Sequence, residues 1–148
     1  MTVERTQVGV KGYAGDLTVL QAWDMLKDSL NTALIDVRTK AEWTFVGLPD
    51  LSSIDKKIHP ISWVLFPDMS PNSRFVEELK TSQPDVTAPV LFLCRSGVRS
   101  IAAAIAATNA GYANCYNVLG GFEGDLDKSS HRGTSAGWKA ENLNWVQG

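Results

Sequence analysis

The clearest change between apolar and polar positions lies in residues 90–107. Four apolar residues in a row, Val90–Leu93, precede a polar loop, and an alanine-rich apolar stretch follows that loop. A short apolar run without alternation is typical of a parallel strand that is buried on both faces. The pattern therefore predicts a central strand that leads through a short loop into a helix. The predicted buried face of this helix consists of Val98, Ile101, Ala102, Ile105 and Ala106.

Two further helices are predicted from their first turns. Thr18 and Gln21 have the spacing of a capping box, and Thr39 and Glu42 repeat it. The first box predicts a helix that begins near Thr18, and the second predicts a short helix over Lys40–Phe45. The apolar stripe of the first helix is predicted to consist of Val19, Trp23, Leu26 and Leu30.

The remaining apolar segments alternate between strand and helix patterns. Predicted strands cover residues 33–35, 61–66 and 115–118, and a predicted helix covers residues 73–80. Residues 47–60 are mostly polar and contain prolines, and we expect them to form a surface excursion. Strands that alternate with helices predict an α/β domain with a parallel sheet.

Cys94 and Asp36 both follow predicted strands of this sheet. In parallel α/β sheets, ligands bind outside the carboxyl ends of the strands. The helix after Cys94 places N–H groups and the positive end of a dipole beside the thiol, which favours the thiolate. Gly97 allows the loop to curl so that its N–H groups form an anion-binding nest. The sequence therefore predicts a nucleophilic thiolate that faces an anionic substrate.

The side chains of the loop add donors for such an anion. Arg95 lies beside the thiol and Arg99 at the start of the helix, where a planar guanidinium can pair with an oxyanion. Ser96 and Ser100 add hydroxyl donors, and Ser100 is also a candidate for the helix cap. The alternative is a buried core thiol beside solvated arginines. A core cysteine has no need of two arginines, a glycine and two serines, so we favour a functional loop.

Composition and charge exclude several classes of function. The 148 residues are enough for one domain with a sizeable core, and the net charge of −2 comes without any Lys/Arg-rich run. Nucleic acids and anionic membranes are therefore not expected as main partners. The N-terminal segment lacks the apolar core of a signal peptide, and residues 101–107 are too few to cross a bilayer. We expect a cytoplasmic protein.

The two cysteines, Cys94 and Cys115, are too few for a disulfide scaffold. No Cys-x-x-Cys or His-x-x-x-His spacing accompanies them, and His59 and His131 are isolated in the sequence. No metal site is expected. Cys115 lies in a predicted strand, and we interpret it as a small buried hydrophobic residue rather than as a resolving thiol.

Three motifs follow one another along the chain: LIDVR at residues 34–38, CRSGVRS at residues 94–100 and NVLGGF at residues 117–122. In this order they resemble the three signatures of the single-domain rhodaneses, a family of sulfurtransferases. The resemblance implies one three-layer, rhodanese-like α/β domain over residues 1–148. Its centre would be a five-stranded parallel sheet flanked by helices.

The resemblance also implies a ping-pong transfer of sulfur. The Cys94 thiolate would attack the outer sulfur of thiosulfate or a related small anionic donor, release sulfite and become a persulfide. A thiophilic acceptor, such as cyanide, a cellular thiol or a protein, would then take the sulfur. No metal or organic cofactor is implied, and the oligomeric state stays open. The implied substrate-binding residues are Arg95, Ser96, Gly97, Val98, Arg99 and Ser100, with the backbone N–H groups of residues 95–99 around the persulfide.

Asp36 and Arg38 match the first signature. We interpret them as structural supports for the loops, because a carboxylate at a strand end can accept hydrogen bonds from neighbouring loop amides. A plain turn with an exposed ion pair is the alternative.

Two segments depart from the family pattern. Residues 46–49 lack the histidine of the segment that the family usually has after its first signature, and the loop that follows to Pro60 is longer than usual. Residues 123–137 separate the third signature from a C-terminal tail at residues 138–148. These two loop insertions either border the mouth of the active site and select the sulfur donor or acceptor, or they are peripheral.

Two other functions fit part of the pattern. A persulfide carrier that relays sulfur to a protein partner would use the same Cys94 chemistry, with thiosulfate turnover incidental. Dual-specificity phosphatases of similar fold have a loop one residue longer, with arginine six positions after the cysteine. Arg99 lies five positions after Cys94. The shorter loop fits a sulfur atom on cysteine better than a phosphoryl group, so a phosphatase is the less favoured hypothesis.

Overall fold

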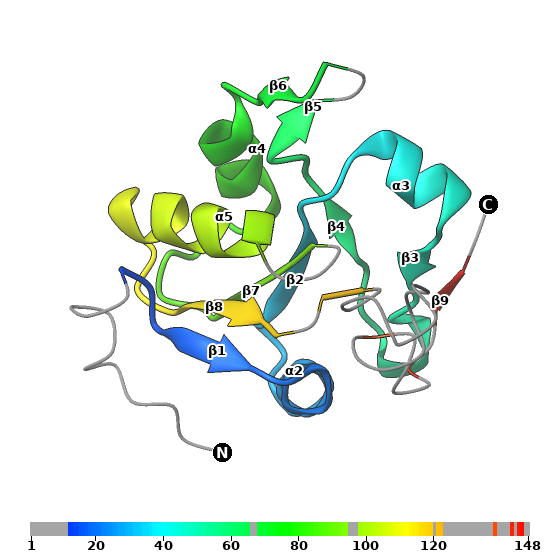
Figure 1. Cartoon of the computed structure of the whole chain (residues 1–148). Helices are drawn as coiled ribbons and strands as arrows, with labels where there is room; N and C mark the ends of the chain where they lie inside the picture. Colours follow the sequence, from blue (N-terminus) through cyan, green and yellow to red (C-terminus); the bar gives the residue numbers. More distant parts are fainter. Residues whose placement is uncertain are drawn as a thin grey trace.

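A computed structural model describes residues 12–65, 68–94, 98–119, 121–122, 138, 143 and 145–146. Its centre is a five-stranded sheet in the order β1-β8-β7-β2-β4, in which every pair of neighbours is parallel (Figure 1). This confirms the predicted α/β class and the five-stranded parallel sheet. The strands are β1 (Gly15–Leu17), β2 (Ala33–Asp36), β4 (His59–Pro60), β7 (Val90–Leu93) and β8 (Cys115–Val118).

The helices cover both faces of the sheet (Figure 1). One face packs against α4 and α5, the other against α2, and α3 follows the carboxyl end of β2. In the described parts of the chain, no helix has the length and apolarity needed to span a bilayer. The helices are α2 (Val19–Asp28), α3 (Lys40–Phe45), α4 (Phe75–Ser82) and α5 (Val98–Asn109), with a 3-10 turn, η2, at Ser52–Ile54.

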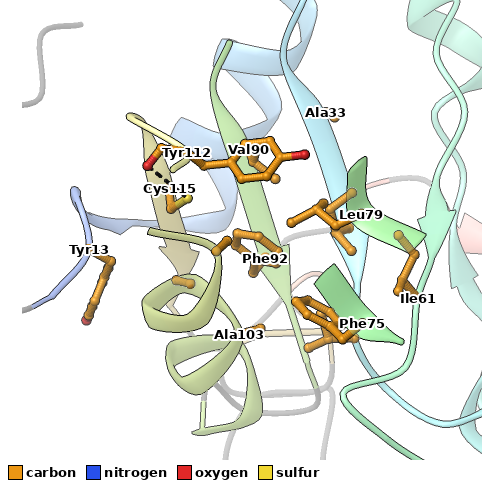
Figure 2. Packing of buried hydrophobic residues seen from close by; sticks show 14 of the residues in the cluster. Tyr13, Ala33, Ile61, Phe75, Leu79, Val90, Phe92, Ala103, Tyr112 and Cys115 are labelled. Carbon is orange, nitrogen blue, oxygen red and sulfur yellow. Dashed lines mark hydrogen bonds between the residues drawn. The ribbon is translucent and has the colours of Figure 1, made fainter. Parts of the chain in front are cut away.

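The central strand β7 is buried on both faces, as its continuous apolar run predicts. Val90 and Phe92 belong to the core beneath α4 and α5, whereas Leu91 and Leu93 belong to the core beneath α2. Cys94 continues this alternation and lies on the side of α5. Burial of each such leucine or phenylalanine contributes roughly 1.5–3 kcal/mol. Figure 2 shows the first core, where the β7 side chains lie among Phe75, Leu79 and Ala103.

Both predicted capping boxes are present. The Thr18 hydroxyl accepts from the N–H of Gln21, whose side chain accepts from the N–H of Thr18. Thr39 and Glu42 form the same pair, and α3 has the predicted bounds. The predicted stripe of α2 is wrong at its last position. The helix ends at Asp28 with an extended cap residue, so Leu30 lies beyond it and is 93% exposed.

The predicted buried face of α5 is also wrong in part, because it includes two exposed residues. Val98 is 77% exposed and Ile101 is 36% exposed. Alanines allow a helix to approach a sheet closely, so the stripe of small residues takes the inner position. Val98 and Ile101 turn outward, whereas Ile105 is half-buried and packs against the core. The fully buried residues of α5 are Ser100, Ala103, Ala104 and Ala107.

The predicted strand at residues 61–66 is displaced in the structure. The edge strand of the sheet is β4, His59–Pro60, where an edge position tolerates a proline. The N–H groups of Ile61 and Trp63 donate to the carbonyls of Asp36 and Val37, so backbone contact with β2 continues past β4.

Two small antiparallel pairs lie outside the central sheet. β5 (Val64–Leu65), which lies inside the range predicted as a sheet strand, pairs with β6 (Ser70–Pro71). β3 (Leu48–Pro49) pairs with β9 (Trp145–Val146) of the C-terminal tail. The expected surface excursion at residues 47–60 therefore contains β3, η2 and the edge strand β4, and it pairs with the tail.

Candidate active site

Cys94 lies at the carboxyl end of β7, directly before the loop that leads to α5. The residue is 1% exposed, and its carbonyl accepts a 2.8 Å hydrogen bond from the N–H of Phe122. Arg95, Ser96 and Gly97 lie outside the described residues, so the predicted anion nest stays a prediction. Val98 begins α5, which therefore starts four residues after the thiol.

The Cys94 sulfur contacts a side chain of α5. Its Sγ lies 3.3 Å from Oγ of Ser100, which is fully buried. Ser100 in turn donates to Oδ1 of Asn117 at 2.5 Å, and Nδ2 of Asn117 donates to Asp16 at 3.1 Å. The sequence singles out Ser100 as a hydroxyl donor and places Asn117 at the start of the third motif without a role, whereas Asp16 carries no local signal of a role at the site.

Arg99 points to Glu42 of α3 rather than into solvent. Its two terminal nitrogens donate to the two carboxylate oxygens of Glu42 at 2.6 and 2.9 Å, and both side chains are 19% exposed. The hydrogen bond and charge of Glu42 outweigh burial and raise the pKa of Arg99, and smaller contributions in the same direction come from Cys94 and Asp36. The guanidinium is therefore charged and within electrostatic range of the sulfur.

Glu42 is a residue of the site that sequence reasoning recognises only as a helix cap. Burial raises the pKa of its carboxyl, but the hydrogen bonds and charge of Arg99 and the N–H of Thr39 outweigh burial, so the pKa is lowered. An ionised Glu42 thus fixes the orientation of the Arg99 guanidinium through two parallel bonds.

Asp36 and Arg38 form an ion pair that is 0% exposed, so the alternative of an exposed pair is wrong. Nε of Arg38 donates to Oδ1 of Asp36 at 2.9 Å, and Nη2 donates to Oδ2 at 2.7 Å. Nη2 also donates to the carbonyl of Gly47, and the guanidinium lies 4.3 Å from the centre of the Phe122 ring. The N–H of Phe122 donates to the carbonyl of Cys94. Through Phe122, the ion pair therefore connects the first and third motifs to the cysteine.

Cys115 lies at the other end of the central strands. It is opposite Val90, four residues before Cys94, so the two cysteines are about 13 Å apart along the strand direction. A disulfide needs Cα atoms within about 7 Å. Cys115 is fully buried, its Sγ lies 3.9 Å from the carbonyl of Tyr112 (Figure 2), and burial raises its pKa to about 11. These features match the prediction of a buried hydrophobic residue.

The C-terminal tail packs beside the third motif. The ring of Trp145 in β9 meets Phe122 edge to face at 6.0 Å, and Trp138 is fully buried against Trp23 at 5.7 Å. The insertion at residues 123–137 lies outside the described residues. Among the residues that the structure describes, no group of three His, Cys, Asp or Glu side chains is arranged to hold a metal ion.

The chain has close relatives in sequence and structure. The family model of the rhodanese-like domain matches residues 18–128. The crystal structure of Rv0390 from M. tuberculosis is similar with a TM-score of 0.84 and 51% identity, covering 92% of this chain and 99% of that chain. The protein RC0915 of Rickettsia conorii is 42% identical over 125 residues, 84% of this chain and 91% of its own. The thiosulfate:glutathione sulfurtransferase of Saccharomyces cerevisiae is 30% identical over 88 residues, 60% of each chain.

Proposed function

We propose that this chain, which belongs to the family of rhodanese-like domains, is a sulfurtransferase that carries sulfane sulfur as a persulfide on Cys94. The observation that carries the proposal is the position of Cys94. Its thiol follows the central strand, contacts a hydroxyl of the next helix and lies within electrostatic range of a fixed guanidinium. A thiosulfate-using relative with a thiol acceptor supports thiosulfate as donor and a thiol as acceptor.

The proposed reaction has two displacements at sulfur. The Cys94 thiolate attacks the outer sulfur of thiosulfate, the sulfur–sulfur bond of the donor breaks, and sulfite leaves with the electron pair. An acceptor nucleophile then attacks the terminal sulfur of the persulfide, and the thiolate leaves with its electron pair. The two steps balance without an oxidant or reductant.

The residues of the loop have separate roles in this proposal. Arg95 and Arg99 attract the anionic donor, and the N–H groups of residues 95–99 hold the negative terminal sulfur at the start of α5. Asp36 and Arg38 are supports that do not touch the donor. No metal or organic cofactor takes part.

Initial-rate kinetics with thiosulfate and cyanide test this mechanism. Because sulfite leaves before the acceptor binds, varying both substrates is expected to give parallel double-reciprocal lines for thiocyanate formation. Intersecting lines, which require both substrates on the protein at once, would contradict a persulfide intermediate.

Arg99→Ala is expected to raise the KM for thiosulfate roughly ten- to hundredfold, because one charge-assisted contact contributes about 1.5–3 kcal/mol to anion binding. The matched control is Arg74→Ala, since Arg74 also pairs with a glutamate, Glu77, but lies exposed on the N-terminal side of α4. The control is expected to leave the KM unchanged. If Arg99→Ala has no larger effect than the control, Arg99 has no role in holding the donor.

Cys115→Ala is expected to leave the kcat and KM of sulfur transfer within about twofold of wild type, because this thiol is buried and remote from Cys94. Thiocyanate formation measures both parameters. A loss of turnover in a folded Cys115→Ala protein would assign Cys115 a role as second thiol.

The alternative function is a persulfide carrier that delivers sulfur to a protein partner. It is favoured by Val98, an apolar side chain that is 77% exposed beside the cysteine loop. A carrier would show slow turnover with thiosulfate and cyanide but fast transfer from its persulfide to the partner protein.

A further inference from the structure

A line of hydrogen-bonded side chains leads from Cys94 to the edge of the sheet. Sγ of Cys94 lies 3.3 Å from Oγ of Ser100, and Ser100 donates to Oδ1 of Asn117 at 2.5 Å. Nδ2 of Asn117 donates to Oδ1 of Asp16 in β1 at 3.1 Å. The hydroxyl of Tyr13 donates to the same Asp16 oxygen at 2.9 Å. Three elements, α5, β8 and β1, thus contribute to one line.

The carboxylate of Asp16 and the hydroxyl of Tyr13 determine which group donates in each hydrogen bond of this line. A carboxylate only accepts hydrogen bonds, so Asp16 selects the NH₂ group of the Asn117 amide. The carbonyl of Asn117 consequently faces Ser100. Burial, together with the hydrogen bond to Asp16 and its charge, raises the pKa of Tyr13 to about 12. Tyr13 therefore keeps its proton at neutral pH and donates to Asp16.

Ser100 has a single hydroxyl proton, which it donates in the hydrogen bond to the carbonyl of Asn117. The hydroxyl then presents a lone pair to the sulfur of Cys94. A protonated thiol can donate to this lone pair, whereas a thiolate receives no hydrogen bond from Ser100 unless the hydroxyl turns away from Asn117. Asn117 and the sulfur thus compete for one proton.

We propose that Asp16 and Asn117 are positioning residues that aim the Ser100 hydroxyl away from the sulfur and thereby favour the protonated form of Cys94 in the resting protein. This rests on Cys94 as the nucleophile of the proposed function and adds a control on its reactivity. Neither residue touches the donor or the reacting sulfur.

Other charges act on the same thiol and stay in place when the line is altered. Arg99 of α5, paired with Glu42 of α3, lies within electrostatic range of Cys94, and Asp36 at the end of β2 lies opposite Leu93, the residue before Cys94. A variant in the line from Ser100 to Asp16 leaves these three groups unchanged. A change in thiol ionisation in such a variant therefore reports on the Ser100 hydroxyl.

The first test is the pH profile of Cys94 alkylation by iodoacetamide in Asn117→Leu, an apolar replacement of similar shape. With the carbonyl gone, the sulfur is the remaining acceptor for the Ser100 proton among the described partners of this hydroxyl, so the midpoint is expected to move to lower pH by about one unit. Mass spectrometry of the Cys94 peptide measures the rate, and the alkylation of Cys115 is counted separately. A midpoint that stays or rises would overturn the proposal.

The second arm repeats the substitution in a Ser100→Ala background. Without the hydroxyl, Asn117→Leu is expected to leave the midpoint of the Ser100→Ala protein unchanged. A merely structural effect of Asn117 on packing would persist in both backgrounds, and a persistent shift would therefore overturn the proposal. Thermal unfolding of all variants shows which of them are folded.

The third arm compares Asp16→Asn with Asp16→Ala and applies even where Asn117→Leu does not fold, since Asp16 is only partly buried. The amide oxygen introduced by Asp16→Asn still accepts from Tyr13 and Asn117, so the midpoint is expected to stay near that of wild type. Asp16→Ala lets the Asn117 amide turn, and the midpoint is expected to fall. Equal shifts in both variants would show that only the charge of Asp16 matters and would overturn the proposal. Alkylation needs no sulfur donor, so a failure of sulfur transfer leaves this test intact.

Discussion

Cys94→Ser is expected to abolish sulfur transfer, lowering the rate of thiocyanate formation by more than about a thousandfold. A serine oxygen cannot form a persulfide, and no second thiol lies near Cys94 among the residues that the structure describes. The fold is expected to persist, because a hydroxyl at this buried position can pair with Ser100 as the thiol does. Steady-state turnover with thiosulfate and cyanide measures the loss.

The matched control for Cys94→Ser is Cys115→Ala, which removes the other buried thiol of the same chain. Thermal unfolding of both variants separates a loss of chemistry from a loss of structure. Wild-type turnover in a folded Cys94→Ser protein would contradict the proposed mechanism as a whole.

The second large effect concerns stability. Asp36→Asn removes one partner of a fully buried ion pair and leaves the Arg38 guanidinium without its counter-charge. Breaking a buried pair in this way costs about 3–5 kcal/mol. We therefore expect the free energy of unfolding, measured in urea at equilibrium, to fall by about that amount. The site is affected as well, because Arg38 contacts Phe122, whose N–H holds the carbonyl of Cys94.

Two further variants show whether the uncompensated charge is the cause. The double variant Asp36→Leu with Arg38→Met buries no charge, so it is expected to be more stable than Asp36→Asn. Arg74→Met breaks an exposed ion pair and is expected to have little effect on stability. An Asp36→Asn protein as stable as Arg74→Met would contradict a supporting role for the buried pair.

The elements that local chemistry determines can be predicted from the sequence. The capping box of Thr39 and Glu42 gives α3 its observed bounds, and the apolar run gives β7. The rotation of α5 cannot be predicted in this way, because its sequence is apolar around most of the helix and close packing selects the alanine stripe. The edge strand β4 has only two residues, one of them proline, and carries no strand pattern.

The site also contains contacts that the local sequence predicts and contacts that only the fold produces. Cys94 and Ser100 lie in one motif, and the loop sequence is sufficient to predict that they lie near each other. The partner of Arg99, Glu42, is 57 positions away, and Asp16 is 101 positions from Asn117. Contacts at such separations depend on the order of strands in the sheet, and a single sequence without its fold gives no signal for them.

Intact-mass spectrometry of the purified protein after brief treatment with thiosulfate tests the central claim most directly. The predicted result is a gain of one sulfur atom that maps to the Cys94 peptide, disappears on addition of cyanide and is absent in Cys94→Ser. Polysulfide serves as a second donor in the same experiment. A protein that gains no sulfur from either donor, or gains it at Cys115, would contradict the proposal that Cys94 carries the sulfur.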